Sequence, residues 1–500
     1  MISFLCLARR PSQVLLALAL LGSPGLATAE SMDLAAVITQ VLSSHPDLDI
    51  SRIDTEIAST DRQNTEGILD PVLSASIGVS EDKTPVSSIF QSSKSRQGQV
   101  SAGISQPLAS GATLSASAAF NRNKKSYASP AAAAFSLINP EYRNQFDISY
   151  RHPLLRGADR PDYRNTLVAA DAGVQSARQQ QQVVARALSL QALNLFYQLA
   201  SDEINVRIAE DAVKRAKQLL SYQHSREQFG LIEASDRLQA EALLAARQTA
   251  LEQARGRHAS DMAQLNRLML RQPMHLITLK TAPDMPDEAP DLEEAVSISK
   301  QKRPEFAALQ ARLEASEAML KTARDQDQIQ LDMVAQLGTR SLDGSAGAAL
   351  QKSTSIHDHF ASLSLEMSDV IHRNAAHAGI RKAELNRLRI VSEQRQVLES
   401  VRNDLSNAIT AIRTGLPALK AAQKQVSIEK KKFAAESRRY REGRSDTATI
   451  VQFEGDLSNA ELQAELLKLN LQLADKQLIW AQGLLLSRLG IPLATRNNPS

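Results

Sequence analysis

The sequence has one cysteine and few aromatic residues. Phe, Tyr and Trp together make up 4% of its 500 residues, and there is one Trp. Aromatic side chains supply much of the apolar surface of globular cores, so this composition argues against one large conventional core. Gln, Ala, Ser, Leu, Arg and Glu are abundant instead, which is typical of long helices with much exposed surface. The single cysteine, Cys6, excludes a disulfide within the chain.

Long apolar runs are also missing. The first 29 residues combine a basic pair at positions 9 and 10, a short apolar run over 14–21 and Ala-Thr-Ala at 27–29. This order predicts an export signal peptide over residues 1–29, whose removal leaves no cysteine. No later stretch approaches the roughly 20 apolar residues of a membrane-spanning helix. Any contact of the mature chain with a bilayer is therefore expected to be made by strands.

Neither sign of charge dominates, and catalytic motifs are missing. The 58 Lys and Arg residues against 55 Asp and Glu give a net charge of +3, which does not indicate nucleic acid as a partner. The sequence has no phosphate-binding glycine loop, nucleophile elbow or H-E-x-x-H pair. His357 and His359 form the only close histidine pair, with fewer ligands than a metal site requires. The sequence therefore predicts no enzyme, no cofactor and no metal site.

Two stretches of the chain repeat the same landmarks. Leu34 and Pro46 have the same separation as Leu292 and Pro304, and charged, Ala-rich helical sequence follows each proline. Near the other end of each stretch a glycine stands nine residues before a Gln-x-Glu triplet; the glycines are Gly230 and Gly443. Such internal similarity predicts a duplicated structure.

The repeats have the following expected limits. The first spans residues 30–272 and the second residues 292–492, with a proline-rich linker over 273–291 and a short tail over 493–500. Each repeat is expected to contain a helix, strands, a very long helix, a tight turn and a further long helix.

Strands are predicted where apolar and small polar residues alternate, at about 70–152 in the first repeat and about 329–367 in the second. One apolar face and one polar face suit both a lipid-facing barrel wall and a soluble two-faced sheet. Four to six strands cannot enclose an open pore, so copies from other subunits would have to close a barrel. Three subunits with four strands each would give about twelve. The hairpin Val100–Phe120 would either raise this number or fold outside the barrel.

The helical segments carry heptad patterns. Apolar residues recur at steps of three and four over 188–220, 398–440 and 450–485, which predicts coiled-coil packing. Asp202 interrupts the first run, and Gly415, Glu429 and Glu436 interrupt the second. The helix over about 165–223 would be roughly 90 Å long at 1.5 Å per residue. Pro417 is expected to kink its helix.

Together these features resemble the TolC family of outer-membrane efflux and secretion channels, over roughly residues 31–492. The resemblance is carried by the paired Leu…Pro helix starts, by Gln106-Pro107-Leu108, by the segment 152–165 and by the two turn regions at 229–241 and 440–454. No single motif is specific, but their order, spacing and repetition are.

The resemblance implies a mainly α protein with β-structure: a homotrimer whose outer-membrane β-barrel, embedded in lipid, continues as a periplasmic α-helical coiled-coil tunnel. The tunnel would dock on a periplasmic adaptor (membrane fusion) protein joined to an inner-membrane pump or ABC transporter. The chain would then be a passive exit duct in a tripartite efflux pump or a type I secretion system. The alternative is a secreted periplasmic coiled-coil adaptor or structural protein, which explains the heptads but not the strands or the duplication.

Channels of this family open at their periplasmic turns, so the resemblance implies a set of entrance and gating candidates. These are Gly230, Asp236, Gln239, Tyr440, Gly443, Asp446, Gln452 and Glu454. A ring of carboxylates would favour cations, although acidic residues also stabilise ordinary helix starts. Where many members have Asp after the second turn this chain has Gln452, which leaves an inner acidic ring undecided. The transported substrate, whether drug, metal, polysaccharide or protein, is open as well.

Overall fold

The computed structural model describes residues 30–83, 85–88, 90–229, 233–281, 284–355 and 358–492. The predicted signal peptide, Gly230, His357 and the tail at 493–500 therefore lie outside the described residues. The chain divides into two compact units. The first comprises residues 1–37, 195–283 and 431–462, and the second comprises 38–194, 284–430 and 463–500. Each unit is described by itself.

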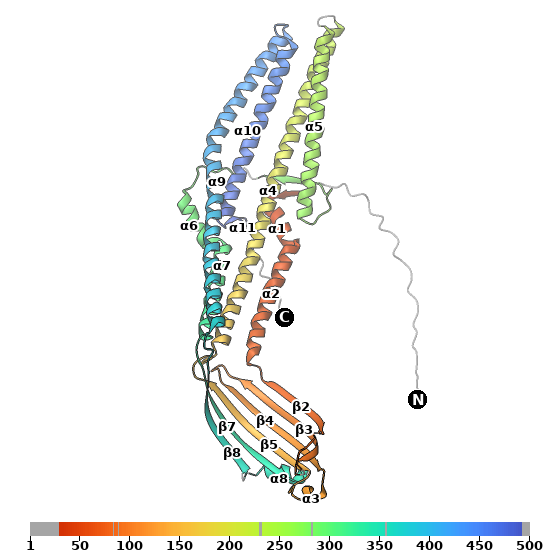
Figure 1. Cartoon of the computed structure of the whole chain (residues 1–500). Coiled ribbons are helices and arrows are strands. Elements are labelled where there is room, and N and C mark those ends of the chain that lie inside the picture. The colour runs from red at the N-terminus through yellow and green to blue at the C-terminus, as the bar shows by residue number, and fades with distance from the viewer. Residues whose placement is uncertain are drawn as a thin grey trace, which may run out of the picture. The chain divides into compact units, whose positions relative to one another are not determined.

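The helices confirm the predicted duplication, because those of one repeat match those of the other almost residue for residue in length (Figure 1). The matched pairs are α1 (Leu34–Ser44, 11 residues) with α6 (Leu292–Lys302, 11), α2 (Pro46–Glu66, 21) with α7 (Pro304–Asp325, 22), α4 (Pro161–Gln228, 68) with α9 (Asn374–Arg441, 68), and α5 (Ala234–Leu268, 35) with α10 (Thr447–Ala481, 35).

The repeated Leu…Pro landmark marks a break between two helices. Pro46 and Pro304 each occupy the first turn of their helix, where the missing N–H costs no hydrogen bond. The residue before each proline is extended, with φ/ψ of −74°/129° at His45 and −82°/126° at Arg303. A proline disfavours the helical conformation of the preceding residue, so the chain leaves one helix and begins another at this point.

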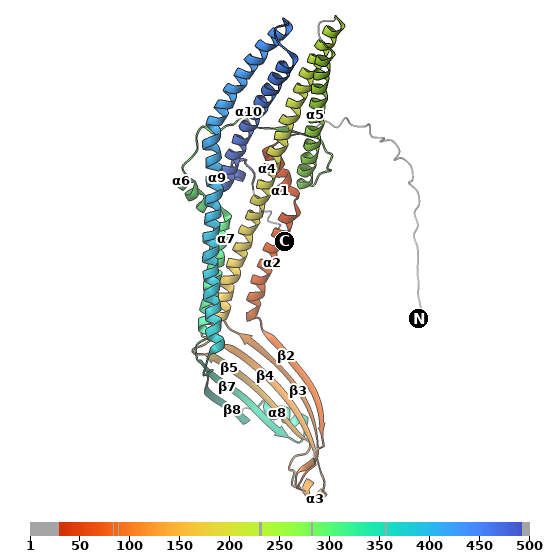
Figure 2. The ribbon, with the colours of Figure 1, turned by 45° about the horizontal axis from the view of Figure 1, so that its top comes forward.

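The second unit contains a six-stranded sheet in which every neighbouring pair is antiparallel (Figure 2). Its strands, in spatial order, are β2 (Val72–Asp82), β3 (Ser92–Pro107), β4 (Thr113–Tyr127), β5 (Glu141–Pro153), β7 (Gln330–Asp343) and β8 (His359–Ser368). The hairpin that the sequence left undecided is β3–β4. It lies inside this sheet, between β2 and β5.

Several short elements were not predicted. In the first unit β1 (Glu30–Asp33) pairs in parallel with β6 (Ile277–Lys280), which lies within the predicted linker. The others are the 3-10 helix Gly67–Leu69, α3 (Pro130–Ala133), α8 (Ala346–Ser353) and α11 (Leu485–Arg488). None of the helices in the described part of the chain combines the length and apolar character needed to cross a membrane.

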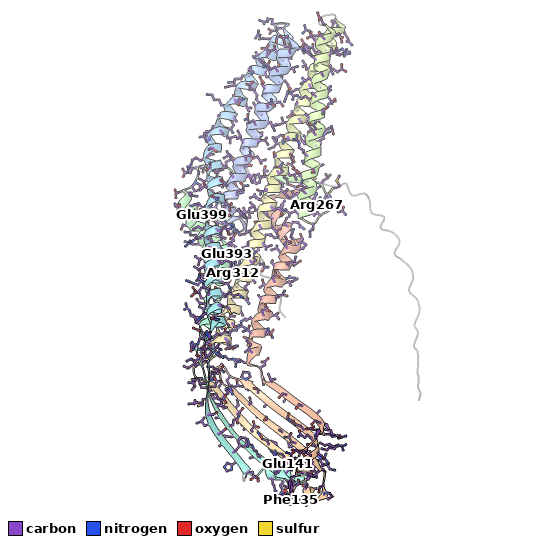
Figure 3. All side chains as sticks on the ribbon, in the orientation of Figure 1. Phe135, Glu141, Arg267, Arg312, Glu393 and Glu399 are labelled. Carbon is purple, nitrogen blue, oxygen red and sulfur yellow. The ribbon has the colours of Figure 1, made fainter. Side chains whose placement is uncertain are left out.

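The heptad residues form the core of the helical layers, as predicted. In the second unit Val401, Leu405 and Ile412 of α9 are fully buried against Ala474 and Leu478 of α10. The predicted interruption at Gly415 has a steric reason: a Cβ there would lie 2.7 Å from Leu471 of α10. The helix α9 continues through Pro417 as one element. At the surface of the same unit, Arg312 of α7 pairs with Glu393 of α9 at 2.8 Å (Figure 3).

A buried polar cluster in the second unit surrounds the single tryptophan, Trp480 of α10. Arg186 of α4 and Arg303 lie over its ring, with guanidinium carbons 4.9 and 5.5 Å from the centroid. Both arginines pair with Glu305 at the start of α7. Burial, followed by the charge of Arg303, lowers the pKa of Arg186 to about 10. The cluster therefore joins one helix of the first repeat to two of the second.

Candidate gate at the helix turns

The turn between α9 and α10 is closed by Gly443. Its φ is +75°, and the following N–H, from Arg444, donates to the carbonyl of Arg439 at 2.8 Å. The Gly443 N–H donates to the carbonyl of Tyr440 at 3.1 Å. This left-handed ending is where glycine is favoured, because other residues are strained there. Gly443 therefore fixes the direction in which the chain leaves α9.

Asp446 caps the start of α10. Its Oδ1 accepts the N–H of Thr449 at 2.7 Å, and this bond, with others from Thr449 and the neighbouring backbone, lowers the pKa of Asp446. A carboxylate in this position satisfies an unpaired amide and interacts favourably with the helix dipole. Asp446 is exposed in the single chain, so capping is compatible with an accessible charge.

Thr447 connects four helices of the first unit. Its buried hydroxyl donates to Oδ1 of Asp236 in α5 at 3.0 Å, and it accepts Nε2 of Gln223 in α4 at 2.6 Å. The hydroxyl of Tyr440 in α9 lies 3.2 Å away. Since Thr447 has one hydrogen to donate and gives it to the carboxylate, Tyr440 is the donor in this last bond. One hydroxyl on α10 thus holds the ends of α4, α5 and α9.

Tyr440 is part of the core at this end of α9. It is 4% exposed, and its ring lies 5.7 Å from that of Tyr222, centroid to centroid. Burial raises the pKa of Tyr440. The sequence left a core role and a hydrogen-bonding role open for this residue. The structure shows both.

Glu454 lies about two turns after the start of α10 and is 3% exposed. Its Oε1 accepts Nε of Arg215 in α4 at 3.0 Å, and its Oε2 accepts Nη2 of Arg247 in α5 at 2.8 Å. Arg215 also lies 3.8 Å from Glu461. Two cations compensate the Glu454 carboxylate, so in this arrangement it acts as an ion-paired bridge between three helices.

The remaining candidates are placed as follows. Gln239 of α5 and Gln452 of α10 are exposed. The structure brings Asp236 and Tyr440 together through Thr447, whereas Asp446 bonds to its own helix. Sequence reasoning missed Gln223, Thr447, Arg215 and Arg247. A signal existed for the first two: Gln223 follows Leu220, and Thr447 precedes Ile450, by one further three-residue step of the heptad pattern.

A buried carboxyl pair lies elsewhere in the first unit. Asp202, the residue that interrupts the heptads of α4, is 4% exposed and interacts with Asp261 of α5. Burial, and then the hydrogen bond and charge of Asp261, raise the pKa of Asp202 to about 6, while Arg257 acts in the opposite direction. A raised carboxyl pKa means that the folded state prefers the protonated acid.

This pair predicts a pH-dependent stability. Because the pKa of Asp202 is higher in the folded state than its ordinary value of 3.8, the folded state is stabilised relative to the unfolded state at acidic pH, and this advantage is lost as pH rises from about 4 to about 6. At pH 7.5 Asp202→Asn is expected to raise the stability by about 1–3 kcal/mol. Thermal melting of the detergent-solubilised protein at pH 4 and pH 7.5 measures this. Asp211→Asn, at an exposed position of the same helix, is the control, and an equal effect of both variants would contradict the prediction.

Part of the second repeat is similar to a known protein family. Residues 295–484 match the family model described as outer membrane efflux protein. No curated protein matches the chain significantly.

The whole chain is similar in structure to several solved channels. The outer-membrane channel OprN is 17% identical, with a TM-score of 0.66 over 90% of this chain and 89% of its own. CusC is 14% identical, with a TM-score of 0.65 over 90% and 92% of the two chains. The outer membrane protein VceC from Vibrio cholerae is 15% identical, with a TM-score of 0.64 over 90% and 96%. The chain therefore has the fold of these outer-membrane channels, and the predicted resemblance and the mainly α fold with its duplicated helix–strands–long helix–helix repeat are confirmed.

Proposed function

We propose that the protein is the outer-membrane channel of a tripartite efflux pump or type I secretion system. Three copies form a passive exit duct that is gated at the helix turns and has no chemistry of its own. A periplasmic adaptor protein and an inner-membrane pump or ABC transporter supply the substrate and the energy. The predicted leader at residues 1–29 directs export and is removed.

The observation that carries the proposal is the exposed apolar face of the six-stranded sheet. Leu73 and Ile77 of β2 are 78% and 82% exposed, and Leu363 and Met367 of β8 are 72% and 74% exposed. Large exposed apolar patches are rare on soluble proteins, whereas in a membrane such a patch contacts the apolar acyl chains of lipids. The residues between them point to the other face and are mostly Ser, as in Ser74, Ser76, Ser362 and Ser364. A lipid-facing and a water-facing side are the two sides of a barrel wall.

The edges of the sheet support assembly with further copies. Within the described chain, β2 and β8 each pair with one neighbour, which leaves the backbone groups of their outer edges without a partner strand. Unpaired backbone groups cost several kcal/mol each in the hydrocarbon region, so strands there occur in closed barrels. Pairing of β2 with β8 of the adjacent copy closes the wall, and a three-membered ring matches the proposed trimer.

Isolation from the outer membrane tests the proposal. The full-length protein, expressed with its leader, is expected in the outer-membrane fraction. There it should run on gels as a trimer, and heating should convert this band to a monomer band of lower apparent mass. Removal of residues 1–29 is expected to abolish this location. A water-soluble monomer released from the periplasm would overturn the proposed function.

Thr447→Val tests the gate. The variant keeps the shape of the side chain and removes the hydroxyl that joins four helices, leaving Asp236, Tyr440 and Gln223 without this partner. Hydrogen bonds of this kind contribute about 1 kcal/mol each, so the open state is expected to gain on the order of tenfold in population or more. Single-channel recording of purified trimers in planar bilayers measures the open fraction.

Thr414→Val is the matched control for this variant. Thr414 is exposed on α9, and its hydroxyl bonds within its own helix to the carbonyl of Thr410 at 2.8 Å. It is expected to leave the open fraction unchanged. Equal open fractions in Thr447→Val and the unmodified protein would remove Thr447 from the gate.

A further inference from the structure

We infer that all six strands of each subunit belong to the transmembrane wall, so that the trimer closes an eighteen-stranded barrel instead of the twelve-stranded one that four strands per subunit would give. The inference rests on the proposed trimeric channel. It concerns the hairpin β3–β4, which the sequence alone placed either in the wall or outside it. Four features of this hairpin place it in the wall.

The first feature is its length. The strands β3 and β4 have 16 and 15 residues, longer than the 11 and 10 residues of β2 and β8 at the two edges. A transmembrane strand needs about 9–11 residues. The hairpin is therefore long enough to pass through the whole hydrocarbon layer and continue beyond it.

The second feature is the register. A single row across all six strands consists of apolar residues only: Leu73, Ile104, Ala116, Ile148, Leu337 and Ala361. The adjacent row, which faces the other side, runs from Val72 through Ser105, Ser115, Ser149 and Gln336 to Ser362. The hairpin thus continues the lipid-facing and water-facing rows of its neighbours without a gap.

The third feature is a set of side-chain hydrogen bonds on the polar face. Ser101 of β3 bonds to Ser76 of β2 at 2.8 Å, and Ser117 of β4 donates to Asp147 of β5 at 2.9 Å. The hydroxyl of Ser115 donates to that of Ser105 within the hairpin at 3.1 Å. These bonds join the hairpin to the strands on both of its sides, so the polar face is one continuous surface of small hydroxyl and amide side chains.

The fourth feature is the tight turn between β3 and β4. Its backbone is closed by the N–H of Leu108, which donates to the carbonyl of Ala112 at 2.8 Å. The N–H of Asp159, in the connection from β5 to α4, donates to the carbonyl of Ser110 at 3.2 Å. At Gly111, whose φ is +89°, a Cβ would lie 2.4 Å from the carbonyl oxygen of Gly157 in the same connection. The turn is therefore fixed at the end of the sheet where the strands meet the helices.

With the hairpin included, each subunit gives the wall six strands, but only four of them connect along the chain to a long helix. Four strands connect along the chain to long helices: β2 to α2, β5 to α4, β7 to α7 and β8 to α9. The strands β3 and β4 connect to other strands at both ends, with only the four-residue helix α3 between β4 and β5. Because six is an even number, β2 and β8 run in opposite directions and each joint between subunits is antiparallel, like the pairs within the sheet. Barrel diameter grows roughly linearly with strand number, so the bore is about one and a half times that of twelve strands.

Cysteine labelling of the assembled trimer tests the inference, because the chain without residues 1–29 has no cysteine of its own. In the hairpin, Val100→Cys is on the apolar face and Ser101→Cys on the polar face. On the edge strand β8, Leu363→Cys and Ser364→Cys are the matched controls. Trimers reconstituted in phosphatidylcholine vesicles are treated with a water-soluble maleimide or with a maleimide carried on a lipid. Ser101→Cys and Ser364→Cys are expected to react with the first reagent, and Val100→Cys and Leu363→Cys with the second.

The controls separate the two ways in which the idea can fail. Reaction of Val100→Cys with the water-soluble reagent while Leu363→Cys stays protected would place the hairpin outside the wall and overturn the inference, leaving the channel intact. Reaction of both with that reagent would overturn the proposed function together with the inference. Electron microscopy of the unmodified trimer gives an independent measurement. Cross-sections of the barrel are expected to show eighteen strands, and twelve would overturn the inference.

Discussion

Replacement of Glu305 by glutamine is expected to lower the free energy of unfolding by about 3–5 kcal/mol, because it removes the charge that compensates two buried arginines. The side chains of Arg186 and Arg303 are each 7% exposed, and both bond to Glu305. Burial acts to raise the pKa of Glu305, but the hydrogen bond from Arg303 and the charges of both arginines outweigh it and hold that pKa below its usual value. Without the carboxylate, Arg186 would lose this ion-pair partner, and Arg303 would keep the longer contact with Asp404 at 3.5 Å.

The chain reports on this cluster directly, because its single tryptophan is Trp480. Its Nε1 donates to the carbonyl of Arg186 at 2.9 Å. The denaturant midpoint of its fluorescence measures the stability of the site. Glu293→Gln is the matched control, since Glu293 forms an exposed ion pair with Arg402 at 3.1 Å, and such pairs contribute about 0–1 kcal/mol. Equal shifts of the midpoint in the two variants would contradict the argument.

Glu454→Gln is expected to have the second large effect, this time on the entrance. The change leaves Arg215 of α4 and Arg247 of α5 without the carboxylate that joins them to α10. Breaking a buried ion pair on one side costs about 3–5 kcal/mol, and under the proposed function this cost falls on the closed state of the channel. We expect the variant channel to be open for most of the recording time in planar bilayers and to admit large hydrophilic antibiotics into cells.

Two comparisons test this assignment. Glu461→Gln removes the more distant acidic neighbour of Arg215, at 3.8 Å, and is expected to change the open fraction little. Glu454→Met combined with Arg247→Met removes one charge of each sign and is expected to restore part of the closed state, because a buried pair can be replaced by apolar residues with little loss. A closed channel in Glu454→Gln would show that the bridge has no part in gating.

The sequence predicted the repeated architecture because its causes are local. A proline at a helix start, a glycine after a helix and an apolar residue at each third or fourth position act within a few residues of chain. The equal pairs α4 with α9 and α5 with α10 follow from such signals. The strands β1 and β6 were missed because four residues are too few to show an alternating pattern.

The hydrogen-bond network around Thr447 was beyond prediction for a different reason. Gln223 and Thr447 are 224 positions apart, and their contact depends on the rotation of two long helices about their axes. Sequence showed only that polar residues continue the heptad pattern there. The placement of β3–β4 was undecidable in a similar way, because alternation is the same in a wall and in a detached hairpin. The structure shows that the hairpin is in register with β2 and β5 in one sheet. The predicted entrance and gating roles of all eight candidates stay predictions; these are Gly230, Asp236, Gln239, Tyr440, Gly443, Asp446, Gln452 and Glu454.

The matching lengths of the long helices limit how the helical part of the protein can become longer or shorter. Both α4 and α9 have 68 residues, and both α5 and α10 have 35. Loss of seven residues from one of them would preserve its own apolar stripe but shift every later contact by two turns, including those at Thr447. An orthologue suited to a thinner or thicker cell envelope would therefore have to gain or lose heptads in all four helices at once.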